Sequence, residues 1–421
     1  MQINGVGFED LNAIQRRVIL EMDKRDRLAV LGGPGTGKTF IAIFAILKAL
    51  QENKDCFFIV YNKNLNLYIK KLIGKNEFPE YLAKTYHSWI ILYLAKVLSI
   101  EPRLVREKYT YKDGEFRYYW DAILIELNKL SPDKRKIYDF VFLDEAQDIP
   151  LELLTIIKES TKKLMVTFDD SQKIGKDYFE SQKNHTYDRS SILTTLDLAD
   201  SFFDLTQNYR NTDAIEKVAK LFGQYFKPNE FSLKQQTSSL KGPLPNLIRV
   251  KDLSHSIRFI YADYKKNPHD QIGILFANTR QEGDIARYQA FKDEMRTWIT
   301  LPEDQFFYKL GEDNTIKGLQ EPGMYLMSMH SAKGLEFDRV YLIGTEKLDL
   351  ELDEQANLIY VACTRAKKHL TFLYEGETYK GLLKQAFEHP LLFNQFDASP
   401  HQNREDDHQL LTMIDHLDYG G

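Results

Sequence analysis

The stretch Leu28–Thr39, with the sequence LAVLGGPGTGKT, decides the fold of the first part of this chain. Its first four residues are apolar and predict a buried strand, and the pattern G-x-x-x-x-G-K-[ST] follows directly. The apolar run after Thr39 predicts a helix. In such a turn, backbone N–H groups converge on phosphate oxygens, and the positive end of the helix dipole adds to their attraction. The stretch therefore predicts a phosphate-binding loop in a parallel α/β sheet.

The side chains of this loop have separate tasks if the ligand is a nucleoside triphosphate. The Lys38 ammonium reaches the β- and γ-phosphates, and the Thr39 hydroxyl binds Mg²⁺. The expected contacts to the nucleotide come from Gly33, Pro34, Gly35, Thr36, Gly37, Lys38 and Thr39.

A second apolar run, Phe140–Leu143, ends in the carboxylates Asp144 and Glu145. The carboxyl ends of parallel strands are where an α/β sheet presents ligand-binding groups. Adjacent buried carboxylates repel each other unless a cation is present. We therefore expect Asp144 to hold Mg²⁺, directly or through water, and Glu145 to deprotonate an attacking water. This pair favours hydrolysis and argues against a small-molecule kinase.

Strand-like apolar runs alternate with helical patterns in two groups, before and after about residue 205. Continuous runs of this kind are typical of parallel sheets covered on both faces. The runs are Leu28–Gly32, Phe57–Tyr61, Phe140–Leu143 and Leu164–Phe168, then Ile272–Phe276, Met324–Met327 and Val340–Ile343. We expect an α/β fold with a first domain at 1–205, a small insertion at about 91–136, a second domain at 206–395 and a polar tail of disordered composition at 396–421.

Within the insertion, Asp113-Gly114 lies between aromatic arms that extend from Tyr109 to Trp120. This pair favours a tight hairpin turn, because both turn residues tolerate positive φ. The aromatic side chains are suited either to cross-strand packing or to stacking on bases, and the sequence leaves both interpretations open.

Composition sets further bounds. The chain has 421 residues, a net charge of −5, 43% hydrophobic and 28% charged residues, which excludes a disordered, collagen-like or coiled-coil chain. No apolar run approaches the roughly 18 residues of a membrane span, and the first residues do not resemble a secretory signal. Cys56 and Cys363 are expected to be reduced, and His and Cys lack zinc-site spacing. We expect a cytoplasmic protein without a membrane partner.

The sequence DEAQD at Asp144–Asp148 resembles the second motif of the UvrD/Rep-like superfamily 1 helicases. Other motifs of that family follow in the expected order. They are LNAIQ at 11–15, VYNK at 60–63, TYHS at 85–88, DDSQ at 169–172, QNYR at 207–210, HSAKGLEF at 330–337 and YVACTRA at 360–366. The resemblance implies two RecA-like parallel-sheet domains, as in P-loop NTPases, with an ATP cleft between them.

The resemblance also implies roles for individual residues. Gln15 would read the adenine and Tyr209 would stack on it, whereas Gln172, Arg210 and Arg365 would contact the γ-phosphate. Gly334 and Glu336 would also lie at the nucleotide. The implied nucleic-acid contacts are Tyr61, Asn62, Lys63, Thr85, His87 and His330.

Two departures from the family pattern concern stacking and insertions. Phe40 stands where the family often has an arginine beside the base, and we expect it to contact the nucleotide. The aromatic segment after DDSQ lacks a tryptophan, so Tyr178 or Phe179 is the candidate for stacking on a base. The segments between His87 and Asp144 and between Arg210 and His330 are too short for the large insertion domains of longer relatives.

The function implied is ATP- and Mg²⁺-dependent movement along single-stranded nucleic acid, with DNA and 3′-to-5′ movement favoured by the resemblance. A nucleic-acid-responsive regulatory ATPase is the alternative. It would act in a larger complex, such as a DNA-repair or phage-defence system, with a nuclease or repair factor as protein partner.

Overall fold

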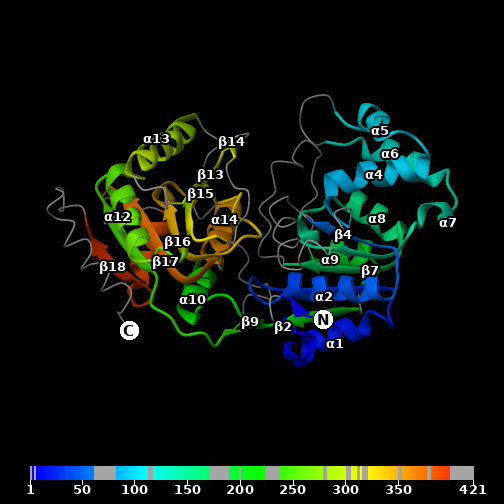
Figure 1. Cartoon of the computed structure of the whole chain (residues 1–421), viewed down its shortest axis with the longest axis horizontal. Coiled ribbons are helices and arrows are strands. Elements are labelled where there is room, and N and C mark those ends of the chain that lie inside the picture. The colour runs from blue at the N-terminus through cyan, green and yellow to red at the C-terminus, as the bar shows by residue number, and fades with distance from the viewer. Residues whose placement is uncertain are drawn as a thin grey trace. The chain divides into compact units, whose positions relative to one another are not determined.

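The computed structural model describes residues 2–3, 6–60, 82–111, 117–169, 189–198, 201–223, 237–277, 282–299, 305–310, 313–314, 321–348, 353–376 and 381–398. The chain divides into two compact units, Met1–Thr206 and Gln207–Gly421. Figure 1 colours the first unit from blue to green and the second from green to red. Each unit is described by itself.

The first unit contains a six-stranded sheet in which every neighbouring pair is parallel. Its order is β5-β4-β6-β7-β3-β8. The strands are β3 (Arg27–Gly32), β4 (Cys56–Val60), β5 (Ala83–Thr85), β6 (Tyr138–Leu143), β7 (Thr161–Phe168) and β8 (Phe202–Leu205). All four strand runs predicted for this part of the sequence lie in the sheet, although Tyr61 is outside the described residues.

Alternate residues of these strands enter two separate hydrophobic cores, one on each face of the sheet. On β4, Phe57 and Ile59 pack into the core that contains Trp89, whereas Phe58 and Val60 pack into the other. Helices α4 (Tyr86–Leu98) and α8 (Leu151–Glu159) cover the first core, and α1 (Ala13–Glu21) and α2 (Lys38–Gln51) cover the second. Burial on both faces explains why the strands are almost continuously apolar.

Short elements complete the first unit. They are β1 (Gln2–Ile3), β2 (Val6–Gly7), η1 (Phe8–Asp10), α5 (Pro102–Tyr109), α6 (Trp120–Asn128), α7 (Pro132–Arg135), η2 (Ala146–Asp148) and α9 (Arg189–Thr195).

The arms of the expected hairpin meet in a single antiparallel bridge rather than in a pair of strands. Thr110 and Tyr118 form a bridge, and the Tyr119 N–H donates to the Tyr109 carbonyl at 2.9 Å. Tyr109, at the end of α5, and Tyr118 are buried in the Trp89 core, so these two rings pack inside the protein. The Asp113-Gly114 turn lies outside the described residues.

The second unit contains an eight-stranded sheet of order β14-β13-β15-β12-β16-β17-β11-β18. Only the β13–β14 pair is antiparallel among the strands described there. The strands are β11 (Asn246–Val250), β12 (Gln271–Phe276), β13 (Phe306–Leu310), β14 (Asp313–Asn314), β15 (Gly323–Ser328), β16 (Phe337–Ile343), β17 (Ala366–Glu375) and β18 (Asn394–Asp397). The α/β prediction with two mainly parallel sheets is confirmed.

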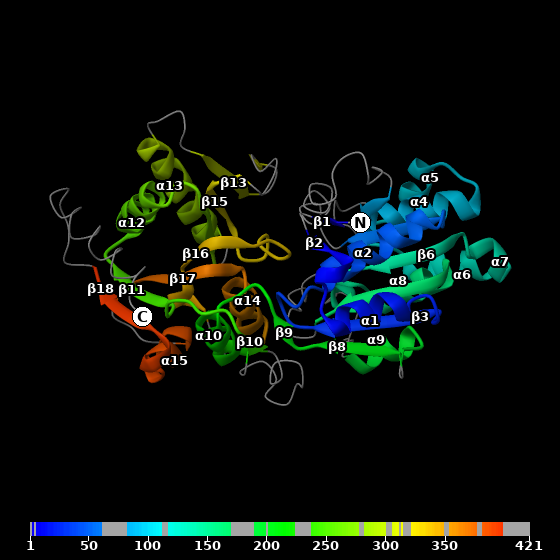
Figure 2. The ribbon, with the colours of Figure 1, turned by 60° about the horizontal axis from the view of Figure 1, so that its bottom comes forward.

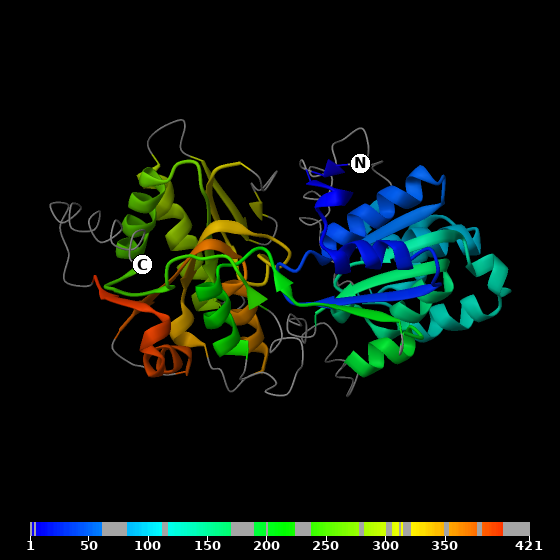
Figure 3. The same cartoon turned by 90° about the horizontal axis from the view of Figure 1, so that it is seen from below.

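Strand β18 continues into the segment expected to be a polar tail. It pairs with β11 at the outer edge of the sheet (Figures 2 and 3), and Ala398 beyond it is buried. An edge strand with one exposed face tolerates the polar sequence NQFD, so composition alone did not reveal it.

Helices cover both faces of this second sheet. The core that contains Ile274 and Met324 packs beneath α12 (Leu253–Lys266) and α13 (Glu282–Trp298), whereas Phe222 of α10 (Asp213–Gly223) meets Phe372 on the opposite face. The remaining elements are β9 (Gln207–Asn208), β10 (Thr237–Ser238), η4 (Thr345–Lys347), α14 (Asp353–Cys363), α15 (Gly381–Glu388) and η5 (Pro390–Leu392).

Two isoleucines of the first unit test this assignment of core and surface. Ile157 on α8 is fully buried, whereas Ile125 on α6 is 60% exposed. We expect Ile157→Ala to lower the free energy of unfolding by about 2–5 kcal/mol, because it leaves a cavity. Ile125→Ala should change it by about 0.5 kcal/mol or less. Urea unfolding followed by circular dichroism measures both, and equal losses would contradict the assignment.

Candidate functional site

The glycine-rich loop lies between the end of β3 and the start of α2, as the sequence predicts. Gly35 and Gly37 have positive φ values of 71° and 88°. A Cβ atom at Gly37 would lie 2.7 Å from the Gln15 side chain, so the close approach of α1 also requires glycine there. The Lys38 ammonium donates to the carbonyls of Gly32 and Gly33 at 2.6 and 3.0 Å. Together the loop and the start of α2 offer an anion-binding geometry.

The carboxylate of Asp144 directly follows β6 and meets this loop. The Thr39 hydroxyl donates to Asp144 Oδ2 at 2.9 Å, and the Thr167 hydroxyl of β7 donates to Oδ1. Burial, and then the neighbouring Glu145 carboxylate, raise the pKa of Asp144 to about 6, against the opposing effects of these hydroxyls and Lys38. A buried carboxylate beside a hydroxyl suits Mg²⁺, which prefers oxygen ligands and completes its shell with phosphates and water.

Glu145 is held in an uncommon backbone conformation, with a φ of 56°. Non-glycine residues in this region cost free energy and cluster at functional sites. Gln147 donates from Nε2 to the Glu145 carboxylate, and its Oε1 accepts from the Asp169 N–H at 3.1 Å. Gln147 therefore links the predicted base to the segment that precedes Gln172.

Two residues that touch these carboxylates were missed by the sequence reasoning. Gln147 lies inside the quoted DEAQD motif, where a neutral amide between carboxylates was the signal that could have indicated it. Thr167 is a hydroxyl in an otherwise apolar part of β7, which gave a weaker signal.

Gln15 lies beside the loop, near the position expected for a residue that reads the base. Its Oε1 accepts from the Asn12 N–H at 3.1 Å in a capping box at the start of α1. Its Nε2 donates to the Thr36 carbonyl at 3.3 Å. Phe40 packs on Phe44 with ring centroids 5.5 Å apart.

In the second unit, Arg210 and Glu336 form an ion pair, with Nε and Oε2 2.8 Å apart. Burial opposes ionisation of Glu336, but Arg210 and Lys367 outweigh it and hold the pKa of this carboxyl below its ordinary value. Gly334 has a φ of 79°, and the Tyr209 side chain is 51% exposed. Tyr209 is therefore accessible to a planar ligand.

Arg365 lies between α14 and β17 and is buried. Its guanidinium donates to the carbonyls of Val361 and Leu335 at 2.9 and 3.2 Å and to the Thr364 hydroxyl at 3.1 Å. The side chain is thus anchored within its own unit. Contact with a phosphate would require the guanidinium to exchange part of this set of bonds.

The residues predicted to contact nucleic acid are only partly described. Tyr61, Asn62, Lys63 and Tyr178, together with Gln172 of the ATP site, lie outside the described residues. Thr85 donates to the Ser88 hydroxyl at 3.2 Å, and His330 follows β15.

His87 stacks on Tyr118 from the insertion, with ring centroids 5.9 Å apart and planes 16° apart. The Tyr118 hydroxyl also lies 3.4 Å from His87 Nδ1. One side of the imidazole is therefore covered by the protein itself.

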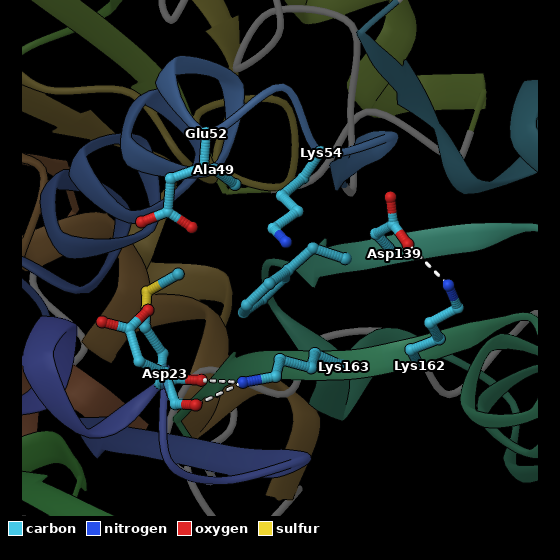
Figure 4. Close-up of a pocket in the computed structure, with 9 residues that line it drawn as sticks. Asp23, Ala49, Glu52, Lys54, Asp139, Lys162 and Lys163 are labelled. Carbon is cyan, nitrogen blue, oxygen red and sulfur yellow. Dashed lines mark hydrogen bonds and ion pairs between the residues drawn. The ribbon is translucent and has the colours of Figure 1, made fainter.

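Within the described ranges, no group of three or more His, Cys, Asp and Glu side chains is arranged to hold a metal, Cys56 and Cys363 are free and buried, and no helix is long and apolar enough to cross a membrane. A cavity of about 380 Å³ lies beside Asp139 and Lys163 near the starts of β6 and β7, at the opposite end of these strands from Asp144. Figure 4 shows the residues that line this cavity. Lysines and carboxylates line it, among them the Lys162–Asp139 ion pair at 2.9 Å.

Comparisons with known proteins agree with these features. A family model of the UvrD-like helicase C-terminal domain matches residues 303–377, and a model of an AAA domain matches residues 15–176. ATP-dependent DNA helicase Rep of Escherichia coli K12 is 29% identical over 140 residues, which cover 29% of this chain and 20% of Rep. DNA helicase II of the same organism is 36% identical over 83 residues, 17% of this chain and 11% of that protein.

These matches are partial. The aligned part of the chain spans a fifth or less of the length of the two curated relatives. Among solved structures, the C-terminal domain of a possible DNA helicase from Lactobacillus plantarum WCFS1 matches with 19% identity and a TM-score of 0.32, covering 44% of this chain and 98% of that chain. At that TM-score the match supports no argument.

The covered imidazole of His87 generates a prediction about stability. Burial lowers the pKa of His87 to about 4, from 6.5. Between these two pH values, the unfolded chain binds a proton at His87 that the folded chain does not bind. The stability that neutral His87 contributes is therefore fully present above about pH 6.5 and is lost as the pH falls toward 4. We expect wild type to lose up to about 3 kcal/mol of unfolding free energy relative to His87→Phe across this window. A constant difference between the two proteins in urea unfolding at pH 7 and pH 4 would contradict this.

Proposed function

Because this chain belongs to the UvrD/Rep-like superfamily 1 helicase family, we propose that it hydrolyses ATP in order to move along single-stranded DNA in the 3′-to-5′ direction. One observation carries the proposal. The hydroxyl of Thr39 and the carboxylate of Asp144 meet at 2.9 Å beside Lys38, so a phosphate loop and an acidic strand end share one buried site.

In the proposed reaction, the phosphates of ATP replace the Gly32 and Gly33 carbonyls as partners of Lys38. Thr39 and Asp144 would hold Mg²⁺, which would supply positive charge at the β- and γ-phosphates. Glu145 takes a proton from the attacking water as the bond between the γ-phosphorus and the ADP oxygen breaks. The bond from Gln147 restricts where the Glu145 carboxylate can point.

Two arginines of the second unit are proposed to contact the γ-phosphate. Arg210 now pairs with Glu336, and Arg365 binds carbonyls of its own unit. An arginine that stabilises transition-state charge raises the rate of phosphoryl transfer by about 10³–10⁵. The arrangement would make hydrolysis depend on the placement of the second unit, which is how a motor couples chemistry to movement.

The regulatory alternative uses the same ATP site. Its support is the contact between His87 and Tyr118, because a covered imidazole offers a nucleic-acid strand less surface than the family resemblance implies. In that case ATP would change affinity for a protein partner such as a nuclease or repair factor. Both functions predict turnover that responds to added strands, so unwinding of a duplex by the isolated chain would count against the regulatory function, and co-purification of a nuclease would favour it.

The first experiment is an ATPase assay titrated with single-stranded DNA, single-stranded RNA and duplex DNA. We expect turnover to rise with single-stranded DNA and to disappear in Lys38→Ala, because the phosphates lose their main cation. Lys48→Ala, a surface change on the same helix, serves as the matched control and should behave as wild type. Turnover that no nucleic acid alters would exclude the motor and would also exclude a regulatory ATPase that responds to nucleic acid. Displacement of streptavidin from 5′-biotinylated strands tests the direction.

Glu145→Gln tests the assignment of the base. A carboxamide cannot accept the water's proton, so we expect single-turnover hydrolysis to fall by about 10²–10⁴ while ATP affinity is retained. Glu152→Gln on α8 is the control for loss of one carboxylate. An unaltered rate in Glu145→Gln would remove Glu145 from this role.

A further inference from the structure

Asn211, which directly follows Tyr209 and Arg210, is fully buried and uses every polar group that it has. Its Nδ2 donates to the carbonyls of Thr364 and Ala366 at 3.0 and 2.6 Å. Its Oδ1 accepts from Asn208 Nδ2 at 3.0 Å. Its backbone N–H donates to Asn208 Oδ1, and its carbonyl accepts from the Ser238 hydroxyl.

Asn208 and Asn211 bond to each other in both directions. The Asn208 side chain also fixes the turn that carries Arg210. Asn208 Oδ1 accepts from the backbone N–H groups of Arg210 and Asn211 at 2.9 and 3.2 Å. The buried side-chain amides of Asn208 and Asn211 thus hold the backbone around Arg210 in place. Because a buried amide without partners costs free energy, this arrangement allows little displacement of the turn.

The carbonyls bound by Asn211 flank Arg365 on both sides. The Arg365 carbonyl itself accepts from the Phe337 N–H at 2.9 Å, so three consecutive carbonyls of this turn have donors. The segment 335–337 reaches both arginines. Leu335 accepts from Arg365, Glu336 pairs with Arg210, and Phe337 binds the Arg365 carbonyl.

We propose that Asn211 is a positioning residue that holds the turns of Arg210 and Arg365 in one fixed relation, so that both guanidinium groups reach a nucleotide phosphate together. The inference rests on the proposed function. Asn211 touches no reacting atom in this scheme and acts through the backbone on either side of Arg365. Its two donated hydrogen bonds join residues that are 153 and 155 positions apart in the sequence.

A general contribution to folding is the competing explanation, and the chain offers a matched residue for it. Asn246 on β11 is also a buried asparagine of the second unit. It donates to the Thr371 hydroxyl and accepts from Asn394 at 3.4 and 3.1 Å, and neither of these partners belongs to the turn of Arg210 or of Arg365. Asn246→Ala therefore measures what a buried asparagine contributes to stability alone.

The experiment is a double-mutant cycle on the full chain with Asn211→Ala, Arg365→Lys and the double variant. It measures kcat, KM for ATP and the thermal midpoint of each. We expect Asn211→Ala to lower kcat by about 10²-fold with little change in KM, since a small misplacement of a catalytic group has an effect of that size. In the Arg365→Lys background, the same change should lower kcat less than about threefold, because both substitutions remove one function.

Asn211→Ser, which keeps a shorter donor, should fall between wild type and Asn211→Ala, and it decides the matter if Asn211→Ala does not fold. Asn246→Ala should lower the thermal midpoint but leave kcat unchanged. The proposal is overturned if the kcat losses of the two single variants multiply in the double variant, or if Asn211→Ala or Asn211→Ser lowers only the midpoint. A wild-type chain without ATPase activity would instead refute the proposed function, and this inference with it.

Discussion

The hydrogen bond between the Thr39 hydroxyl and the Asp144 carboxylate depends on the order of three strands. Asp144 follows β6, Thr167 lies on β7 and Thr39 follows the loop after β3, and the sheet places these strands side by side. Because all three are parallel, their carboxyl ends meet at one edge. A buried carboxylate is costly unless it is hydrogen-bonded, and the two hydroxyls provide those bonds. The sheet order therefore makes a charged site possible inside an apolar core.

Two candidate residues of the second unit, Glu336 and Arg365, lie at the opposite end of its strands. Glu336 precedes β16 and Arg365 precedes β17, so both lie where parallel strands begin. There the peptide groups of the two strands are already paired, with Phe337 opposite Ala366. This pairing sets the spacing of the segments that hold Arg210 and Arg365. The first unit thus gathers acidic and hydroxyl groups at the ends of its strands, whereas the second places Arg365, and Glu336 with its partner Arg210, before strands β17 and β16.

The sequence was informative wherever chemistry depends on contiguous residues. The glycine-rich loop, the DEAQD strand end and the apolar strand runs can each be recognised within about ten residues, and the structure forms an element at each run. Strands β17 and β18 were not predicted, because β17 begins with the polar sequence AKKH and β18 is an edge strand. The stacking of Tyr118 on His87 was also not predictable, because Tyr118 lies in the insertion, far from His87 in the sequence. Contacts between distant segments have no local signature.

Two of the residues that sequence reasoning missed, Gln147 and Asn211, have side-chain amides that join separate segments. Gln147 joins Glu145 to the Asp169 backbone, and Asn211 joins the turns of Arg210 and Arg365. Gln15, which was predicted to read the base, in this structure also joins Asn12 to the loop. An amide both donates and accepts, so it can bridge a carboxylate and an N–H group, or two carbonyls, without adding a buried charge. Charged side chains can then be reserved for the nucleotide, whereas neutral amides fix their positions. On this argument, a buried amide next to a charged motif residue deserves the same scrutiny as the charge itself.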